Sequence, residues 1–353
     1  MNRSSRNPSY RSFALMVAVP AVLLFLVIAV SAGMGYLEIP FSDVLRIILA
    51  EISGADEMIR HLDPSWPVVV AEVRLPRILA AAVVGGGLAV AGTVFQGILQ
   101  NPLADPYTLG VSAGAAFGAA VALIFNIGAF GVYGVPVLAF VFAVATLFVV
   151  IFLAATGRNP DRFSSNNLIL SGIIVAAILS AGLSFIKYVA DEQVSVIIFW
   201  LMGSFAAMTW TKVMLTAVFV GAGFCICLFY SRDLNLMALG GKTAATSGVD
   251  TKKVTLVLLV TASMIAAACV SISGIIGFVG LLVPHMMRAF TGPDNRRLLP
   301  VSLFSGAVLL AGADTLTRAV LPGEIPIGVL TALIGGPFFC WIFRKRQMAG
   351  AGM

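Results

Sequence analysis

The 353-residue sequence has little charge for its length. Asp, Glu, Lys and Arg make up 11% of it, whereas hydrophobic residues make up 59%. A soluble domain carries about 25% charged and about 45–50% apolar residues. The shortage of charge excludes an ordinary soluble protein and predicts a polytopic membrane protein.

Cysteine and histidine are also scarce. The sequence has two histidines and four cysteines, and the cysteines lie in apolar segments without a C-x-x-C pair. Protein metal sites are built mainly from clusters of such residues. The sequence therefore predicts no metal site and no cofactor in this chain, and we interpret the cysteines as small buried apolar residues.

No polar stretch is long enough for a soluble domain, which excludes a fused ATPase or kinase. The longest loop expected on the cytoplasmic side is residues 231–252. Within it, Gly240-Gly241-Lys242-Thr243 is similar to the end of a phosphate-binding loop, but Leu236 stands where the first glycine is required. The loop instead has the pattern of a short amphipathic helix pair. We expect one transmembrane domain over residues 1–353.

Long apolar runs dominate the chain. A spanning helix needs about 20 apolar residues, and ten segments approach that length: residues 13–35, 76–99, 107–126, 132–155, 167–189, 210–230, 253–272, 274–290, 298–317 and 326–343. Residues 191–209, with Trp200 and Gly203, are interpreted as an interfacial or re-entrant helix because aromatic residues favour that depth. The predicted fold class is all-α, with about ten transmembrane helices.

The distribution of basic residues predicts the orientation. An even number of spans puts both termini on one side. If that side is the cytoplasm, fifteen of the 22 basic residues fall inside, among them Arg3, Arg6, Arg158 and Arg162. Short cytoplasmic loops carry the excess of Lys and Arg. Both termini are therefore predicted to be cytoplasmic, and nothing in the charge pattern points to nucleic acid.

The longest loop on the opposite side, residues 36–73, is acidic. We expect a short amphipathic helix at 41–52, followed by an irregular return. Arg74, Arg77 and Arg318 lie near this face, where they either recognise an acidic partner or contact lipid headgroups. Asp314 and Arg318 are four residues apart, a spacing that allows an ion pair across one helical turn.

Two glycine patterns predict close helix packing. One surrounds the polar loop 100–106, with Gly85, Gly86, Gly87 and Gly92 before it and Gly110, Gly114 and Gly118 after it. Glycines four apart share a helix face, and small residues let helices approach each other in lipid. The other pattern is Gly274, Gly277 and Gly280, which we interpret as one face of a short helix interrupted by Pro284.

Several motifs together resemble permeases of the FecCD/BtuC type. They are Arg74-Leu75-Pro76-Arg77, residues 101–106 with 109–114, residues 200–204, 236–248, 274–288 with 293–300, and 324–328. The resemblance covers nearly the whole chain in order, and only residues 1–35 and 45–70 match loosely. It implies a ten-helix permease subunit of an ATP-binding-cassette importer for iron-siderophores, haem or cobalamin, in the cell inner membrane.

The resemblance also implies partners and residue roles. Two copies would form a homodimer, with two ATPase subunits that bind ATP and Mg on the cytoplasmic face. A periplasmic or lipid-anchored substrate-binding protein would dock outside, so this chain would not itself be an enzyme. The implied docking residues are Arg74, Arg77 and Arg318. The implied cytoplasmic gate is Asn101, Leu103, Ser165 and Asn166. The implied ATPase coupling loop contains Leu236, Leu239, Gly240, Ala244, Ala245 and Gly248.

Three alternatives stay open. The first is cargo, because an iron chelate, haem and cobalamin are not distinguished, and the charged residues Lys187 and Asp191 either tune cargo or sit at headgroups. The second is an ion-coupled secondary transporter, which would require buried carboxylates near the midplane; Asp314 is the candidate. The third is a membrane-embedded enzyme, for which the spans offer no polar catalytic constellation.

Overall fold

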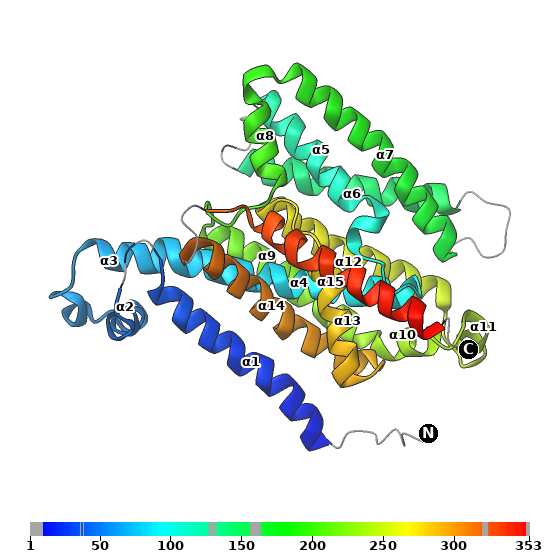
Figure 1. Ribbon diagram of the computed structural model, residues 1–353, viewed down its shortest axis with the longest axis horizontal. Helices are drawn as coiled ribbons and strands as arrows, with labels where there is room; N and C mark the ends of the chain where they lie inside the picture. Colours follow the sequence, from blue (N-terminus) through cyan, green and yellow to red (C-terminus); the bar gives the residue numbers. More distant parts are fainter. Residues whose placement is uncertain are drawn as a thin grey trace.

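The computed structural model of the chain is built from helices (Figure 1). It describes residues 10–350 except 36, 38, 127–130, 132, 156–163 and 320–323, and these described residues form no strand. The all-α prediction is confirmed. Arg3, Arg6, Arg158 and Arg162, which entered the orientation prediction, lie outside the described residues.

A helix occupies each of the ten predicted segments. They are α1 (Tyr10–Gly33), α4 (Leu75–Ile98), α5 (Val111–Ile124), α6 (Gly134–Ala155), α7 (Ser165–Val189), α9 (Trp210–Phe229), α12 (Thr251–Ser273), α13 (Val279–Thr291), α14 (Asn295–Ala319) and α15 (Ile327–Gly350). Within the described residues, 7 helices are long and apolar enough to cross a membrane. The shorter ones are α5, α13 and the apolar part of α15.

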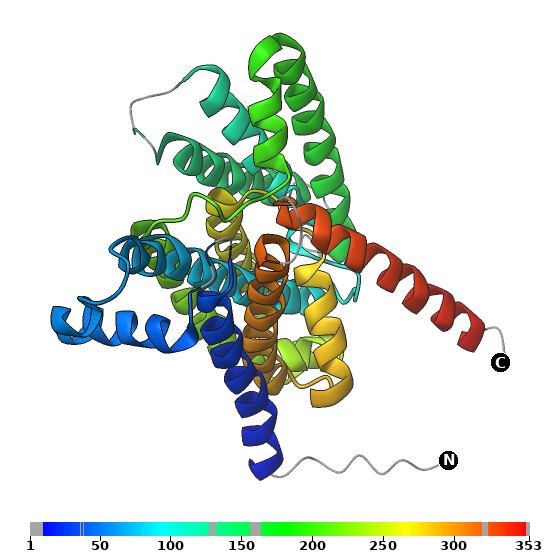
Figure 2. The same ribbon diagram turned by 60° about the vertical axis from the view of Figure 1, so that its left-hand side comes forward.

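Helix α4 lies at the centre of the bundle. In the most apolar stretch of the helical span that contains α4, 89% of the residues are buried, whereas only 6% are buried in the corresponding stretch of α1. Helices α9, α12, α13 and α14 contact it. Helices α5, α6, α7 and the short α8 (Val194–Leu201) group on one side of α4, and α1 lies on the other side (Figures 1 and 2).

Glycines allow the neighbouring helices to approach α4 closely. A Cβ atom added to Gly85 would lie 2.3 Å from the carbonyl oxygen of Gly306 on α14. One added to Gly92 would lie 1.8 Å from the carbonyl oxygen of Gly280 on α13. The glycine face of α5 packs against α6 in the same way. The predicted close packing is confirmed.

The glycine repeat Gly274, Gly277 and Gly280 does not form the predicted helical face, because only Gly280 of the three lies on α13. The backbone between α12 and α13 is irregular, and Gly274 has a φ of +70°, a conformation that suits glycine. The Tyr107 hydroxyl donates to the Ile276 carbonyl at 2.7 Å. Lipid cannot satisfy irregular backbone, so such a segment has to be buried in protein. The predicted start of the helix at 274 is therefore wrong.

The acidic loop contains the expected short helix, α2 (Phe41–Ser53), with Val44, Ile47 and Ala50 buried. The return is less irregular than expected. Helix α3 (Ser65–Val68) and a π-helical turn (Val69–Arg74) continue into α4, so that one helical span runs from Ser65 to Ile98. A π-helical turn widens the helix locally, and Pro76 follows it as the second residue of α4.

The bundle has two ends that concern function. At the arginine end, α4 begins and α14 ends. At the loop end, α4 ends beside the short helix α10 (Ser231–Met237), which packs against a second short helix, α11 (Gly241–Thr246). Helix α1 begins and α15 ends toward the loop end (Figure 1), as an even number of spans requires. The assignment of this end to the cytoplasm stays a prediction.

Candidate functional sites at the two ends of the bundle

At the arginine end, Arg74 and Arg318 bind carbonyl groups at the C-terminus of α1. Arg74 donates to the Ala32 and Gly33 carbonyls, in the last turn of α1, at 2.7 and 3.0 Å. Arg318 donates to the carbonyls of Ser31 and Met34 at 2.8 and 2.7 Å. The last carbonyls of a helix lack partners within the helix, and a cation there is favourable. These two arginines therefore hold the connection between α1 and α2.

Arg77 forms a buried ion pair with Asp314. The side chains are 9% and 2% exposed, and Arg77 Nη2 lies 3.0 Å from Asp314 Oδ1. On its outer side, Arg77 Nη1 lies 3.1 Å from Glu324, whose side chain is 55% exposed. The ion pair that the spacing of Asp314 and Arg318 allows is not among the ion pairs of the described residues. Arg318 donates to the carbonyls at the end of α1, and Asp314 pairs with Arg77.

This arrangement suits the recognition of an acidic group. A cavity of 170 Å³ is lined by Arg77, Asp314 and Glu324. Arginine binds carboxylates through several donors in a fixed plane. An incoming carboxylate can replace the exposed Glu324 while Asp314 keeps the buried charge of Arg77 paired. Docking of a partner on Arg74, Arg77 and Arg318 stays a prediction. Each of these arginines already forms bonds within the chain, so fewer of their N–H groups are available to a docking partner.

At the loop end, the first predicted gate segment is a tight turn. Asn101 Oδ1 accepts from the backbone N–H of Leu103 at 2.9 Å, and the Leu103 side chain is exposed. Asp105 then caps a short 3-10 helix, Pro106–Leu109, by accepting from the N–H and hydroxyl of Thr108. Burial raises the pKa of the Asp105 carboxyl, although these bonds favour its charged form.

The second predicted gate segment, Ser165 and Asn166, opens α7. Ser164 caps this helix by accepting from the N–H of Asn167 at 3.3 Å, and Asn166 is exposed. The two segments lie on neighbouring elements, which meet where Gly172 of α7 packs against the 3-10 helix. This contact is about two turns from Asn166. A gate formed by Asn101, Leu103, Ser165 and Asn166 stays a prediction.

The predicted amphipathic pair at residues 236–248 corresponds to α10 and α11. Leu239, Ala245 and Gly248 are exposed, and Leu236 and Gly240 are half-buried. Ala244 is 0% exposed and faces the bundle. Its burial removes Ala244 from any surface that could contact a partner, whereas Leu239 is 70% exposed and projects from the pair.

Asn235, which the sequence did not single out, joins α10 to the turn before α14. Its Nδ2 donates to Asp294 Oδ1 at 2.6 Å, and its Oδ1 accepts from the backbone N–H and Nδ2 of Asn295 at 2.9 and 2.8 Å. Gln100 joins α10 to the end of α4 by donating to the Met237 carbonyl at 2.7 Å. No local sequence pattern predicts these hydrogen bonds, because they join residues that are distant in sequence.

Helices α4 and α14 connect the two sites physically. At the loop end both are bonded to α10 through Gln100 and Asn235. Along their length Gly85 and Gly306 bring their backbones together. At the arginine end Arg77 of α4 pairs with Asp314 of α14. A displacement of α10 would therefore act on the same helix pair that carries the arginine cluster.

Residues 22–345 match the FecCD transport family. The cobalamin import permease BtuC of Halobacterium salinarum is 38% identical over 97% of this chain and 99% of its own length. The Fe(3+)-citrate import permease YfmE of Bacillus subtilis is 36% identical over 94% of this chain and 95% of its own length.

A solved structure shows the same fold. It is an inward-facing conformation of a putative metal-chelate type ABC transporter, with a TM-score of 0.81 and 34% sequence identity. The match covers 94% of this chain and 99% of the chain in that structure. Two other relatives, of 35% and 36% identity, are the hemin transport permease HmuU of Yersinia pestis and the molybdate import permease MolB of Haemophilus influenzae. Similarity alone therefore does not select one cargo.

Proposed function

Because this chain belongs to the FecCD transport family and is a permease subunit of an ATP-binding-cassette importer, we propose that it moves an iron chelate across the cell inner membrane. The observation that carries the proposal is its likeness over nearly the full length to a metal-chelate type transporter. The similarity to a ferric citrate permease supports iron in particular.

The assembly we propose contains two copies of this chain and two ATPase subunits. The exposed side of α10 and α11, with Leu239, Ala245 and Gly248, is the surface offered to the ATPase. Exposed apolar surface of this kind favours a protein partner. The distribution of Lys and Arg supports a cytoplasmic position for the loop end. ATP and Mg would be held by the ATPase subunits.

A substrate-binding protein would dock at the opposite, arginine end. Its acidic groups would compete with Glu324 for the outer side of Arg77, while Asp314 compensates the buried side. Arg74 and Arg318 would act mainly by fixing α1, since their donors already bind its carbonyls. Selection of the cargo would then rest largely with the binding protein.

Coupling follows from the connections within the chain. Closure of the ATPase subunits around ATP would shift α10 and α11. The bonds of Asn235 and Gln100 would pass that shift to α14 and α4. These two helices would then favour one of two arrangements of the pathway, with a gate at Asn101, Leu103, Ser165 and Asn166.

An ion-coupled mechanism is less well supported. Such transporters use buried carboxylates that bind and release an ion or proton near the midplane. Asp314 is the carboxylate that suggested this mechanism, and it is paired with Arg77 at the arginine end. A carboxylate held by a buried guanidinium is poorly placed to exchange a proton in each cycle.

The test of the cargo is a titration of the binding protein that copurifies with the full-length chain. Ferric siderophores and ferric citrate, haem, cobalamin and molybdate would be added separately, with binding followed by calorimetry. Tight binding of an iron chelate supports the proposal. Tight binding of cobalamin selects the second candidate, which the similarity to BtuC favours, and leaves the importer class intact.

A further inference from the structure

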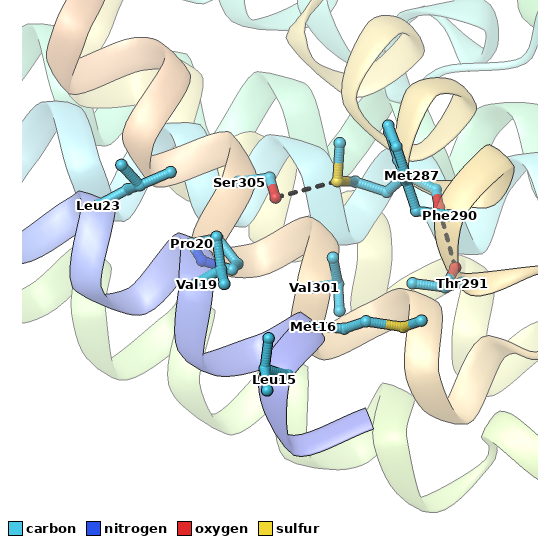
Figure 3. A pocket seen from close by; sticks show the side chains of 10 residues that line it. All are labelled: Leu15, Met16, Val19, Pro20, Leu23, Met287, Phe290, Thr291, Val301 and Ser305. Atoms are coloured by element: carbon cyan, nitrogen blue, oxygen red, sulfur yellow. Dashed lines mark hydrogen bonds between the residues drawn. The ribbon is translucent and has the colours of Figure 1, made fainter. Parts of the chain in front are cut away.

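Helix α1 leaves a groove on each flank near its N-terminal half. One groove, of 670 Å³, lies between α1, α13 and α14 (Figure 3). Leu15, Val19 and Phe290 are exposed on its walls, and the ten residues that line it include no charged side chain. It offers a surface for hydrocarbon and no group that distinguishes one lipid headgroup from another.

The groove on the other flank has a different chemistry. It is 1310 Å³ in volume and lies between α1, α9 and α14. Its walls are largely apolar, with Phe13 and Val17 from α1 among them. Its loop end is lined by three arginines, namely Arg232, Arg296 and Arg297. Apolar walls thus lead directly to a concentration of positive charge.

Among the described residues, one acidic residue lines this groove, and it does not cancel the charge. Asp294 accepts from Asn235 and from the backbone N–H of Arg296, and it lies 3.9 Å from Arg297 Nε. Against three arginines it leaves a net charge of +2 among the lining residues. Arg232 and Arg296 are exposed. Asp294 also occupies the start of α14, so an anion would be held by guanidinium groups and not by helix amides.

We propose that this groove binds an anionic phospholipid of the surrounding bilayer. The acyl chains would lie along the apolar walls, and the phosphate would be bound by Arg232 and Arg296, with Arg297 behind them. Guanidinium groups form strong charge-assisted bonds with phosphate. Basic pockets between membrane helices recognise anionic headgroups. Because the arginines and the hydrocarbon walls belong to one groove, the occupant must carry both an anion and acyl chains.

The test uses the delipidated full-length chain and native mass spectrometry, with phosphatidylglycerol or phosphatidylcholine of the same acyl chains as probes. We expect phosphatidylglycerol to bind at least tenfold more tightly. The double variant Arg232→Gln and Arg296→Gln should weaken phosphatidylglycerol binding by roughly twentyfold to thirtyfold. Phosphatidylcholine should lose much less affinity, because its own ammonium group already compensates the charge of its phosphate. The matched control, Lys242→Gln with Lys252→Gln, removes equal charge from exposed residues at the loop end that do not line the groove.

A second variant tests the apolar walls without altering charge. Ala18 lines the groove and is exposed, so Ala18→Phe should fill it and weaken phosphatidylglycerol binding although all three arginines remain. The proposal is overturned if the two lipids bind equally, or if the control variant loses as much affinity as the arginine variant. It is also overturned if adding the ATPase subunits abolishes the lipid preference, since the arginines would then belong to that interface.

Discussion

Replacement of Asp314 by Asn is the most informative perturbation of the arginine end. The change keeps the size of the side chain and removes its charge. Arg77, whose side chain is 9% exposed, would then retain Glu324 as its one acidic partner among the described residues, and the Glu324 side chain is 55% exposed. Removing one partner of a buried ion pair costs about 3–5 kcal/mol. Because Glu324 still compensates part of the charge, we expect a loss near the lower limit, about 3 kcal/mol.

The assay is equilibrium unfolding of the full chain in mixed detergent micelles. Asp63→Asn serves as the control, since Asp63 lies in an exposed loop where it accepts from the N–H and hydroxyl of Ser65. A double variant with Leu at both Arg77 and Asp314 should recover most of the loss, because an apolar pair of similar volume needs no compensating charge. If Asp314→Asn were as stable as the control, the pair would not be buried as described.

Three further predictions concern docking, coupling and packing. Glu324→Gln removes the competing carboxylate from Arg77, so the binding protein should dock up to about fivefold more tightly; equal affinity at low salt would contradict this role. Leu239→Glu places a charge on the exposed apolar surface of the coupling pair, and should reduce ATP-driven uptake at least tenfold, whereas Ser53→Glu on α2 should not; normal uptake would remove the coupling role. Gly92→Ala directs a methyl group to within 1.8 Å of the Gly280 carbonyl oxygen and should destabilise the chain by at least about 3 kcal/mol, whereas Gly221→Ala, with open space around it, should not; equal stability of the two variants would contradict the close approach.

The helices were predictable because each requires a long apolar run, and lipid permits few other structures. The number and order of the ten segments follow from that requirement. The start of α13 was not predictable by the same means. Glycines three apart suit a helix face, but they also suit an irregular backbone, and the bond from Tyr107 to Ile276 that stabilises it comes from a distant segment.

The candidate sites likewise have features that the sequence predicts and features that it does not. The motifs at 74–77 and 236–248 were visible in the sequence, and their positions at opposite ends of the bundle agree with an arrangement of docking and coupling surfaces. The partners of the charged residues were not visible. Asp314 has Arg318 one turn away on its own helix, yet it pairs with Arg77, because Arg318 reaches the unsatisfied carbonyls of α1. Which member of a coupling pair faces inward, as Ala244 does, is likewise decided by tertiary contacts.

The most direct test of the importer function is uptake into proteoliposomes that contain the full-length chain with its ATPase, with the binding protein and its ferric chelate outside. We predict uptake that requires ATP at the ATPase, requires the binding protein, and is unaffected when sodium and proton gradients are collapsed. Uptake driven by an ion gradient without ATP or the ATPase would contradict the account.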